Sequence, residues 1–276
     1  MSNFEGYILT EGRGKFIKED EALNWIFKNC QKFVSWMGTG DRKSGRFISR
    51  SVGRKSDHNF WLVDPKKVSE PRKSANTYNY YTLIMDNESS WSKFPKRSLS
   101  LICLTDGYDY GRNEFIIFPK DGWRIGNTNE RDLWGVADRI DSRIPTMDDW
   151  ARMVHDLLNF NNERKIKYDK TLPQFKSRCK ELDQYIEENG DHVISDILLN
   201  SKNGWGYQDM YMAFQDWYEG DSYYMFNSMI DPSTLGITLE RAGQNLPKET
   251  EVWTDSPCIM VLSLWWHNNK GKITGK

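Results

Sequence analysis

The sequence contains no long apolar run, no paired cysteines and few histidines. None of its apolar segments approaches the roughly 18 residues that a membrane-spanning helix needs, and the first residues lack the basic and apolar regions of a secretory signal peptide. The four cysteines are widely spaced, without a Cys-x-x-Cys pair, and the four histidines are dispersed. We therefore expect a cytoplasmic protein that does not contact a membrane, with no metal site and with cysteines that serve as small buried residues.

Charge is unevenly distributed along the chain. The net charge is −1, but ten Lys or Arg residues against four Asp or Glu lie between residues 40 and 73. This segment, here called the basic band, predicts an anionic partner such as nucleic acid or a cofactor that carries phosphates. A solvated face that pairs with the acidic remainder of the chain explains the same pattern. The sequence alone leaves both interpretations open.

Hydrophobic periodicity predicts an α+β protein of one domain, residues 1–276, with helices inserted at about residues 146–219. Apolar residues at helical spacing predict one helix over residues 19–37 and four within the insertion. Short apolar and alternating runs predict strands at 46–52, 59–63, 98–105, 114–118 and 258–266. We expect strands 98–105 and 114–118 to be neighbours in one sheet, because only a Gly- and Tyr-rich turn region separates them.

Two glutamates, Glu249 and Glu251, stand one residue apart at the start of a further predicted strand. Side chains alternate between the two faces of a strand, so we expect both carboxylates on one face, close enough to act on one bound molecule. Charged residues at the edge of a sheet also serve solubility alone. This pair therefore indicates either a catalytic site or plain surface charge.

Two further motifs precede this pair. Arg50 lies at the end of an early predicted strand, and Ser98 and Ser100 form a Ser-x-Ser at the entrance of a middle one. The order Arg, Ser-x-Ser, Glu-x-Glu resembles that of the mono-ADP-ribosyltransferases of the Arg–Ser–Glu class, bacterial toxins and phage enzymes that transfer ADP-ribose from NAD to a macromolecule. Leu99 stands where this family usually has Thr, and the helices at about 146–219 lie outside the resemblance. Other arginines compete with Arg50 for the first position: Arg46, Arg54, Arg72 and Arg97.

The resemblance implies an ADP-ribosyltransferase-like fold, a mixed β core of two packed sheets with flanking helices, and NAD as co-substrate. Glu251 would stabilise the positive charge that develops on the ribose as nicotinamide leaves, and Glu249 would orient or deprotonate the acceptor. Arg50 would hold the NAD phosphates, because a planar guanidinium matches phosphate oxygens. Ser98 would brace the catalytic carboxylate, with Ser100 in support.

A polar and aromatic tract at residues 72–82 adds one more candidate. Tyr81 in this tract is placed to stack on a planar ring of the cofactor, and its alternative is packing against a helix.

The macromolecular acceptor stays open between a base of RNA or DNA, which the basic band and the tyrosines of the tract at 72–82 favour, and a protein arginine. Because such a transferase would be toxic, the resemblance implies a role in toxin–antitoxin or phage-defence conflict, with a neutralising antitoxin or chaperone-like partner. One alternative is a non-catalytic nucleic-acid-binding or interaction module on the same fold. Another is a metal-dependent nuclease, which the dispersed histidines and carboxylates disfavour.

Overall fold

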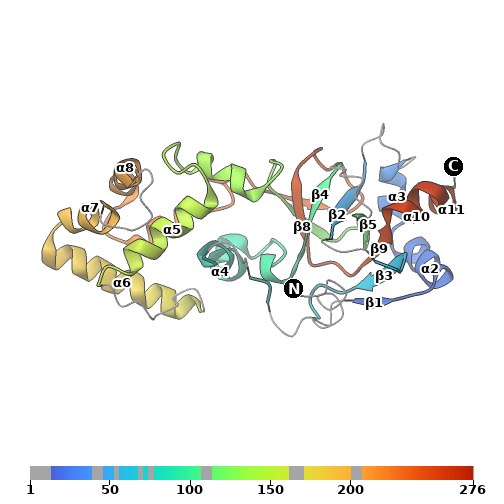
Figure 1. The fold of residues 1–276 in the computed structure, drawn as a ribbon, viewed down its shortest axis with the longest axis horizontal. Coiled ribbons are helices and arrows are strands. Elements are labelled where there is room, and N and C mark those ends of the chain that lie inside the picture. The colour runs from blue at the N-terminus through green and yellow to red at the C-terminus, as the bar shows by residue number, and fades with distance from the viewer. Residues whose placement is uncertain are drawn as a thin grey trace. The chain divides into compact units, whose positions relative to one another are not determined.

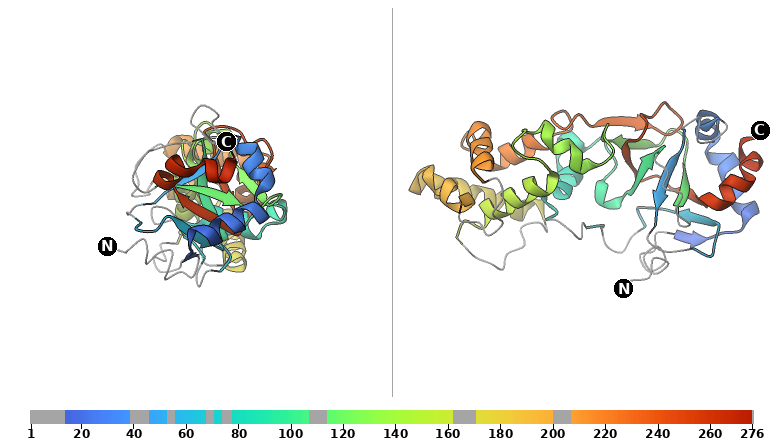
Figure 2. Two further views of the ribbon diagram at one scale, coloured as in Figure 1. Left: turned by 90° about the vertical axis from the view of Figure 1, so that its right-hand side faces the viewer. Right: turned by 45° about the horizontal axis from the view of Figure 1, so that its top comes forward.

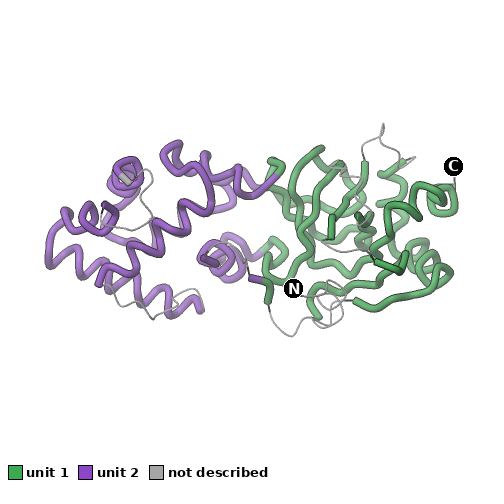
Figure 3. Tube along the Cα trace, viewed as in Figure 1, with its two compact units in different colours: residues 1–72, 93–131, 238–276 green, residues 73–92, 132–237 purple. Residues whose placement is uncertain are grey.

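The computed structural model describes residues 14–38, 46–52, 56–67, 71–73, 78–106, 114–161, 171–199 and 207–275. The chain divides into two compact units, shown in Figure 3. The sheet unit comprises Met1–Arg72, Lys93–Arg131 and Thr238–Lys276, and the helical unit comprises Lys73–Ser92 and Asp132–Ile237. The helical unit is therefore longer than the predicted insertion at 146–219 and also takes in a short segment from the first third of the chain.

The sheet unit contains one nine-stranded sheet (Figure 1). In spatial order its strands are β1 (Gly14–Phe16), β3 (Phe60–Val63), β9 (Cys258–Leu262), β5 (Glu114–Pro119), β2 (Ile48–Ser51), β4 (Leu101–Thr105), β8 (Glu251–Thr254), β6 (Arg124–Asn127) and β7 (Thr238–Arg241). Every pair of neighbours is antiparallel. The chain is thus α+β, but the expected mixed core of two packed sheets is wrong in strand direction and in number, because β2 pairs with both β4 and β5 and joins all nine strands.

The core of the sheet unit lies between the middle strands and the terminal helices. Strands β5, β8 and β9 are buried along their whole length, as continuous apolar runs predict for strands that are covered on both faces. Helices α2 (Glu19–Asn29) and α10 (Ser263–Asn269) pack on β9, and α11 (Gly271–Thr274) packs on α2 and α3 (Gln31–Met37). Both views in Figure 2 show these blue and red helices side by side, so the two ends of the described chain form one layer.

The helical unit is built from amphipathic helices around an aromatic centre. It contains α4 (Tyr80–Asn87), α5 (Met147–Leu158), α6 (Leu172–Asn189), α7 (His192–Leu199), α8 (Tyr207–Trp217) and α9 (Ser222–Met229), with 3-10 turns η1 (Ser89–Trp91) and η3 (Leu133–Arg139). Thr146 and Thr171 cap α5 and α6 by accepting a backbone N–H three residues on. Trp150, Phe175 and Phe226 are fully buried in its core. No helix among the described residues is long and apolar enough to cross a bilayer.

Several predicted elements differ in their bounds or neighbours. The predicted helix 19–37 is two helices that meet at Cys30, whose backbone leaves the helical region with φ −128°. The predicted strand 258–266 ends at Leu262 and continues as α10. Strands β4 and β5 lie in one sheet but are not neighbours, since β2 lies between them. All four cysteines are buried and free, as predicted.

The contact between β6 and β8 depends on one residue without a side chain. Gly126 lies directly opposite Trp253 in the register, and a Cβ at Gly126 would come within 2.2 Å of the indole ring. Trp253 is completely buried. The absence of a side chain at residue 126 is therefore what allows a tryptophan in β8.

Gly126→Ala is expected to destabilise the protein by about 1–3 kcal/mol, because an added methyl group overpacks a filled site. Urea unfolding followed by tryptophan fluorescence measures this change. Gly135→Ala, where a Cβ meets nothing within 4 Å, is the control and should change stability by less than about 0.5 kcal/mol. Equal stability of the two variants would contradict the packing described here.

Candidate active site

The three sequence motifs lie on three adjacent strands. Arg50 is in β2, the Ser98–Ser100 motif immediately precedes β4, and Glu251 is the first residue of β8, in the sheet order β2, β4, β8. Their sequence separation gives no indication of this adjacency. The sheet therefore places the motifs in or next to three adjacent strands. Leu104 pairs with Glu251 and Leu101 with Thr254, so the serine motif adjoins the end of β8 that is distant from Glu251.

Glu251 is held at the start of β8 by its backbone. Its N–H donates to the carbonyl of Glu130 at 2.6 Å, and its carbonyl accepts the N–H of Thr128 at 3.0 Å. Only 9% of the residue is exposed. A carboxylate in such a position is costly unless it is paired, so its partner decides what the site can do.

That partner is Arg97, in the 3-10 turn η2 (Arg97–Leu99) before β4. Its Nη2 lies 2.7 Å from Oε1 of Glu251, and both side chains are 11% exposed. The guanidinium also lies 5.2 Å from the ring centroid of Trp253, a cation–π distance. Among the described residues, the buried Nη1 of Arg97 has no hydrogen-bond acceptor. The site therefore holds one ion pair and one donor atom with unused capacity.

The segment before η2 is fixed on the same tryptophan. The indole Nε1 of Trp253 donates to the carbonyl of Pro95 at 2.9 Å, and the ring of Phe94 stacks on the indole with centroids 6.4 Å apart. Gly126 leaves room for the indole on the neighbouring strand. The position of Arg97 relative to Glu251 is thus set by packing around Trp253.

Glu249 does not share a strand face with Glu251, which corrects the geometric expectation. Strand β8 begins at Glu251, and Glu249 has φ +54°, in the left-handed region. Its side chain is exposed. The turn is pinned by Thr105, whose Oγ1 donates to the carbonyl of Pro247 at 2.7 Å and accepts the N–H of Thr250 at 3.0 Å. The two carboxylates therefore occupy different environments, one covered and one open.

Arg50 lies in β2 but on the other face of the sheet from Glu251. Ser49, Leu104 and Glu251 form one row across β2, β4 and β8, and successive side chains alternate faces. Arg50 therefore points away from that row, and its Nη1 donates to the carbonyl of Ile102 at 3.3 Å.

The other arginines that were alternatives to Arg50 differ in their position relative to Glu251. Among the described candidates, Arg97 forms an ion pair with Glu251. Arg46 is exposed just before β2, and the backbone N–H of Arg72 donates to the carbonyl of Ser98 at 2.9 Å. Arg54 lies outside the described residues.

The serine motif takes part in the hydrogen bonding of the turn η2. Ser98 and Ser100 are both buried, and Oγ of Ser100 donates to the carbonyl of Lys96 at 2.7 Å, which closes η2. This turn presents Arg97 to Glu251. Tyr81 belongs to the helical unit, where it is buried in α4.

Asp106 and Cys103, which sequence reasoning did not single out, lie on β4 or at its end. Half-burial raises the pKa of Asp106 to about 6, while the N–H of Phe47 and the charges of Lys248 and Arg46 oppose the rise and Glu249 adds to it. Burial raises the pKa of the Cys103 thiol to about 12, so this cysteine is not a nucleophile at neutral pH. A carboxyl that follows a predicted strand was the only available signal for Asp106.

Among the described residues, neither a metal-binding cluster nor the buried carboxylate of Asp255 adds a reactive group to this site. Among the residues that the structure describes, no group of three or more His, Cys, Asp or Glu is placed to hold a metal ion. Asp255, at the end of β8, is buried and accepts Trp123 Nε1 at 2.7 Å and Arg124 Nη2 at 3.1 Å. These donors, with Lys66 at 3.0 Å, keep the pKa of Asp255 below its usual range in spite of burial, as in a structural ion cluster.

Comparisons with known proteins return no match. No family model matches the chain, and neither a curated protein nor a solved structure matches it. The function therefore has to be argued from the site itself.

The ion pair between Arg97 and Glu251 is expected to contribute a coupling free energy of about 1–3 kcal/mol, since both groups are largely covered and removal of one leaves the other unpaired. A double-mutant cycle with Arg97→Gln and Glu251→Gln, read by urea unfolding, measures it. The exposed pair Lys15–Glu21, at 3.5 Å, is the control and should couple by less than about 1 kcal/mol. A coupling no larger than that of the control would contradict a buried pair.

Asp106 is expected to make stability fall as pH rises from about 4 to 6. Its pKa of about 6 in the folded protein exceeds the ordinary value of 3.8, so the folded state binds more protons within this window and loses that advantage as pH rises. Asp106→Asn should flatten this slope in urea unfolding measured from pH 4 to 7, whereas Asp20→Asn, at an exposed position of α2, should not. An unchanged slope in Asp106→Asn would exclude this carboxyl as the titrating group.

Proposed function

We propose that the protein is a mono-ADP-ribosyltransferase that transfers ADP-ribose from NAD to a macromolecular acceptor. The observation that carries the proposal is the covered carboxylate of Glu251, held by Arg97 at the start of β8. The ordered Arg, Ser-x-Ser and Glu-x-Glu resemblance supports it independently of the geometry.

The reaction suits a fixed carboxylate. The bond between nicotinamide and the ribose breaks, the ribose gains positive charge, and a nucleophilic atom of the acceptor bonds to the same carbon and loses a proton. In this proposal Glu251 stabilises the positive charge, which a preorganised carboxylate in a covered site does more effectively than water. Products are nicotinamide, the ADP-ribosylated acceptor and one proton.

The residues around Glu251 fit a phosphate- and hydroxyl-bearing ligand. Arg97 Nη1 is a buried donor without an acceptor among the described residues, and a ribose hydroxyl or a phosphate oxygen of NAD would satisfy it. We therefore assign to Arg97 the role that sequence order first gave to Arg50, because Arg97 is on the face of Glu251. In this proposal Arg97 binds and orients NAD and takes no part in proton transfer.

Glu249 is proposed to act on the acceptor. It lies two residues from Glu251 and is exposed, so a macromolecule can reach its carboxylate without displacing the covered pair. A carboxylate in water near the reacting atoms can accept the proton that the acceptor nucleophile loses.

The proposed setting is a cytoplasmic conflict system. Modification of an essential RNA, DNA or protein would be toxic, so we propose a toxin–antitoxin or phage-defence role, with a neutralising antitoxin or chaperone-like partner and no membrane target.

One observation favours a second candidate, a non-catalytic nucleic-acid-binding or interaction module. A carboxylate whose ion pair is already closed at 2.7 Å is also what a purely structural pair would show. Turnover of NAD separates the two candidates.

Glu251→Gln is expected to lower nicotinamide release from NAD by at least about a hundredfold, because the amide carries no charge to stabilise the ribosyl cation. Glu249→Gln should keep nicotinamide release and lose transfer to the acceptor, while Glu240→Gln, at the sheet edge, is the control. Release is measured with purified full-length protein, and transfer with labelled NAD and cell lysate.

Treatment of the labelled lysate with protease or ribonuclease then identifies the acceptor class, since only the enzyme that degrades the acceptor removes the label. Absence of both nicotinamide release and label in the wild-type protein would overturn the transferase and leave the binding module.

A further inference from the structure

A polar groove in the sheet unit lies between α3 and the segment that leads to β8. It encloses about 480 Å³. Its described lining includes the cations Lys32 and Arg46, the amides Gln31 and Asn245, and the largely buried Trp36. Cations, amides and an apolar floor in one groove form the combination that binds phosphates and base edges.

The charge of this groove has one sign. Lys32 and Arg46 are exposed, and no carboxylate stands among its described lining. Asp121 lies nearby, but its two oxygens accept the backbone N–H groups of Lys32 and Phe33 at 2.8 Å each. These hydrogen bonds hold its carboxylate at the start of α3, outside the described lining of the groove. The groove therefore attracts anions and repels an arginine-bearing protein surface.

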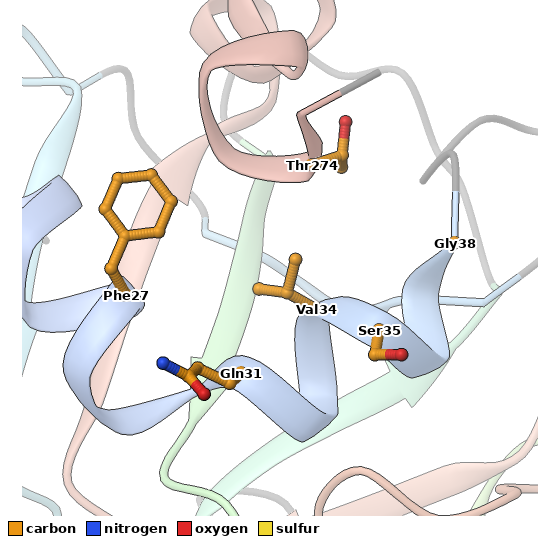
Figure 4. Close-up of a pocket in the computed structure, with 6 residues that line it drawn as sticks. All are labelled: Phe27, Gln31, Val34, Ser35, Gly38 and Thr274. Atoms are coloured by element: carbon orange, nitrogen blue, oxygen red, sulfur yellow. The ribbon is translucent and has the colours of Figure 1, made fainter.

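The adjoining cavity lacks this character. Figure 4 shows Phe27, Gln31, Val34, Ser35, Gly38 and Thr274 around a space of about 340 Å³. Gln31 and Ser35 line both spaces, but the second has no charged residue in its described lining. The polar groove therefore differs from this cavity in having charged residues in its described lining.

The groove wall belongs to the segment that positions Glu249. Gly243 packs on the start of α3 so closely that a Cβ would come within 2.8 Å of the Cβ of Lys32, and its φ is +86°. Ala242 and Leu246 anchor the segment in the core. At its far end Pro247 and Thr250 bond to Thr105. The groove and Glu249 are thus two ends of one pinned segment.

The groove also approaches the charges at the end of β4. Arg46 immediately precedes Phe47, whose backbone exchanges two hydrogen bonds with Asp106. The charges of Arg46, Lys248 and Glu249 act on the pKa of Asp106. An extended nucleic-acid chain held by Lys32 and Arg46 would therefore reach the neighbourhood of Glu249.

We propose that this groove, lined by Lys32 and Arg46, binds the phosphate backbone of single-stranded nucleic acid and delivers it towards Glu249. Arg46, one of the cations of the basic band, thereby gains a partner. As an acceptor site the groove rests on the proposed transferase activity, whereas binding can be measured without NAD.

The experiment uses the full chain and a fluorescein-labelled single-stranded RNA of about 12 nucleotides, the size range of such sites. Fluorescence anisotropy is recorded between about 50 and 200 mM salt. Lys32→Gln/Arg46→Gln is expected to weaken binding roughly tenfold and to reduce the slope of log K against log salt by about 1.4, since each phosphate contact to a single strand contributes about 0.7.

Lys15→Gln/Lys67→Gln removes the same charge from exposed side chains outside the groove and should change neither quantity. Competition by ADP tests whether a free nucleotide fills the groove instead, and a labelled arginine-rich peptide tests for a protein occupant. Equal effects of both double variants, no binding by the wild-type protein, full competition by ADP, or groove-dependent binding of the peptide would each overturn the proposal.

The Glu251→Gln variant distinguishes failure of the proposed transferase activity from failure of the proposed RNA-binding groove. This variant should lose nicotinamide release and bind the RNA like the wild-type protein, while Lys32→Gln/Arg46→Gln should show the reverse. Loss of RNA binding in Glu251→Gln would contradict a separate groove.

Discussion

The placement of Trp253 against Gly126 is the constraint on which the candidate site depends. A fully buried indole fits in β8 only because its neighbour in β6 has no side chain. The indole N–H then fixes Pro95, and the ring face receives the guanidinium of Arg97. This packing around Trp253 positions Arg97 for its ion pair with Glu251. The packing of a buried tryptophan therefore sets the geometry of a charged site.

Covering the Arg97–Glu251 pair changes its chemistry. Two charges on side chains that are only 11% exposed attract each other more strongly than at the surface, but each loses most of its hydration. A ligand that engages Arg97 must therefore offer acceptors at least as good as the carboxylate or bind Nη1, which has no acceptor within the described part of the chain. Phosphate and ribose oxygens meet that requirement, and apolar ligands do not.

The sequence predicted the strands with continuous apolar runs, such as β5 and β9, because their residues carry the signal locally. It missed β6 and β7, whose exposed or glycine-containing segments lack alternation. The sequence did not show that Arg50 lies on the other face of the sheet from Glu251, because the face of a side chain depends on the register. Nor did it show that Arg97 contacts Glu251 across 154 residues. The left-handed backbone of Glu249 was also invisible, since propensity assigns such φ values to glycine or asparagine.

The two glutamates of the Glu-x-Glu motif differ in backbone conformation and in exposure. A non-glycine residue at φ +54° costs about 1–3 kcal/mol, and the bonds from Thr105 to both flanks of Glu249 maintain it. A strand continued through residue 249 would have placed both carboxylates on one face, where like charges oppose each other. The turn instead leaves the carboxylate of Glu251 covered beside Arg97 and that of Glu249 exposed, so the two side chains have different surroundings.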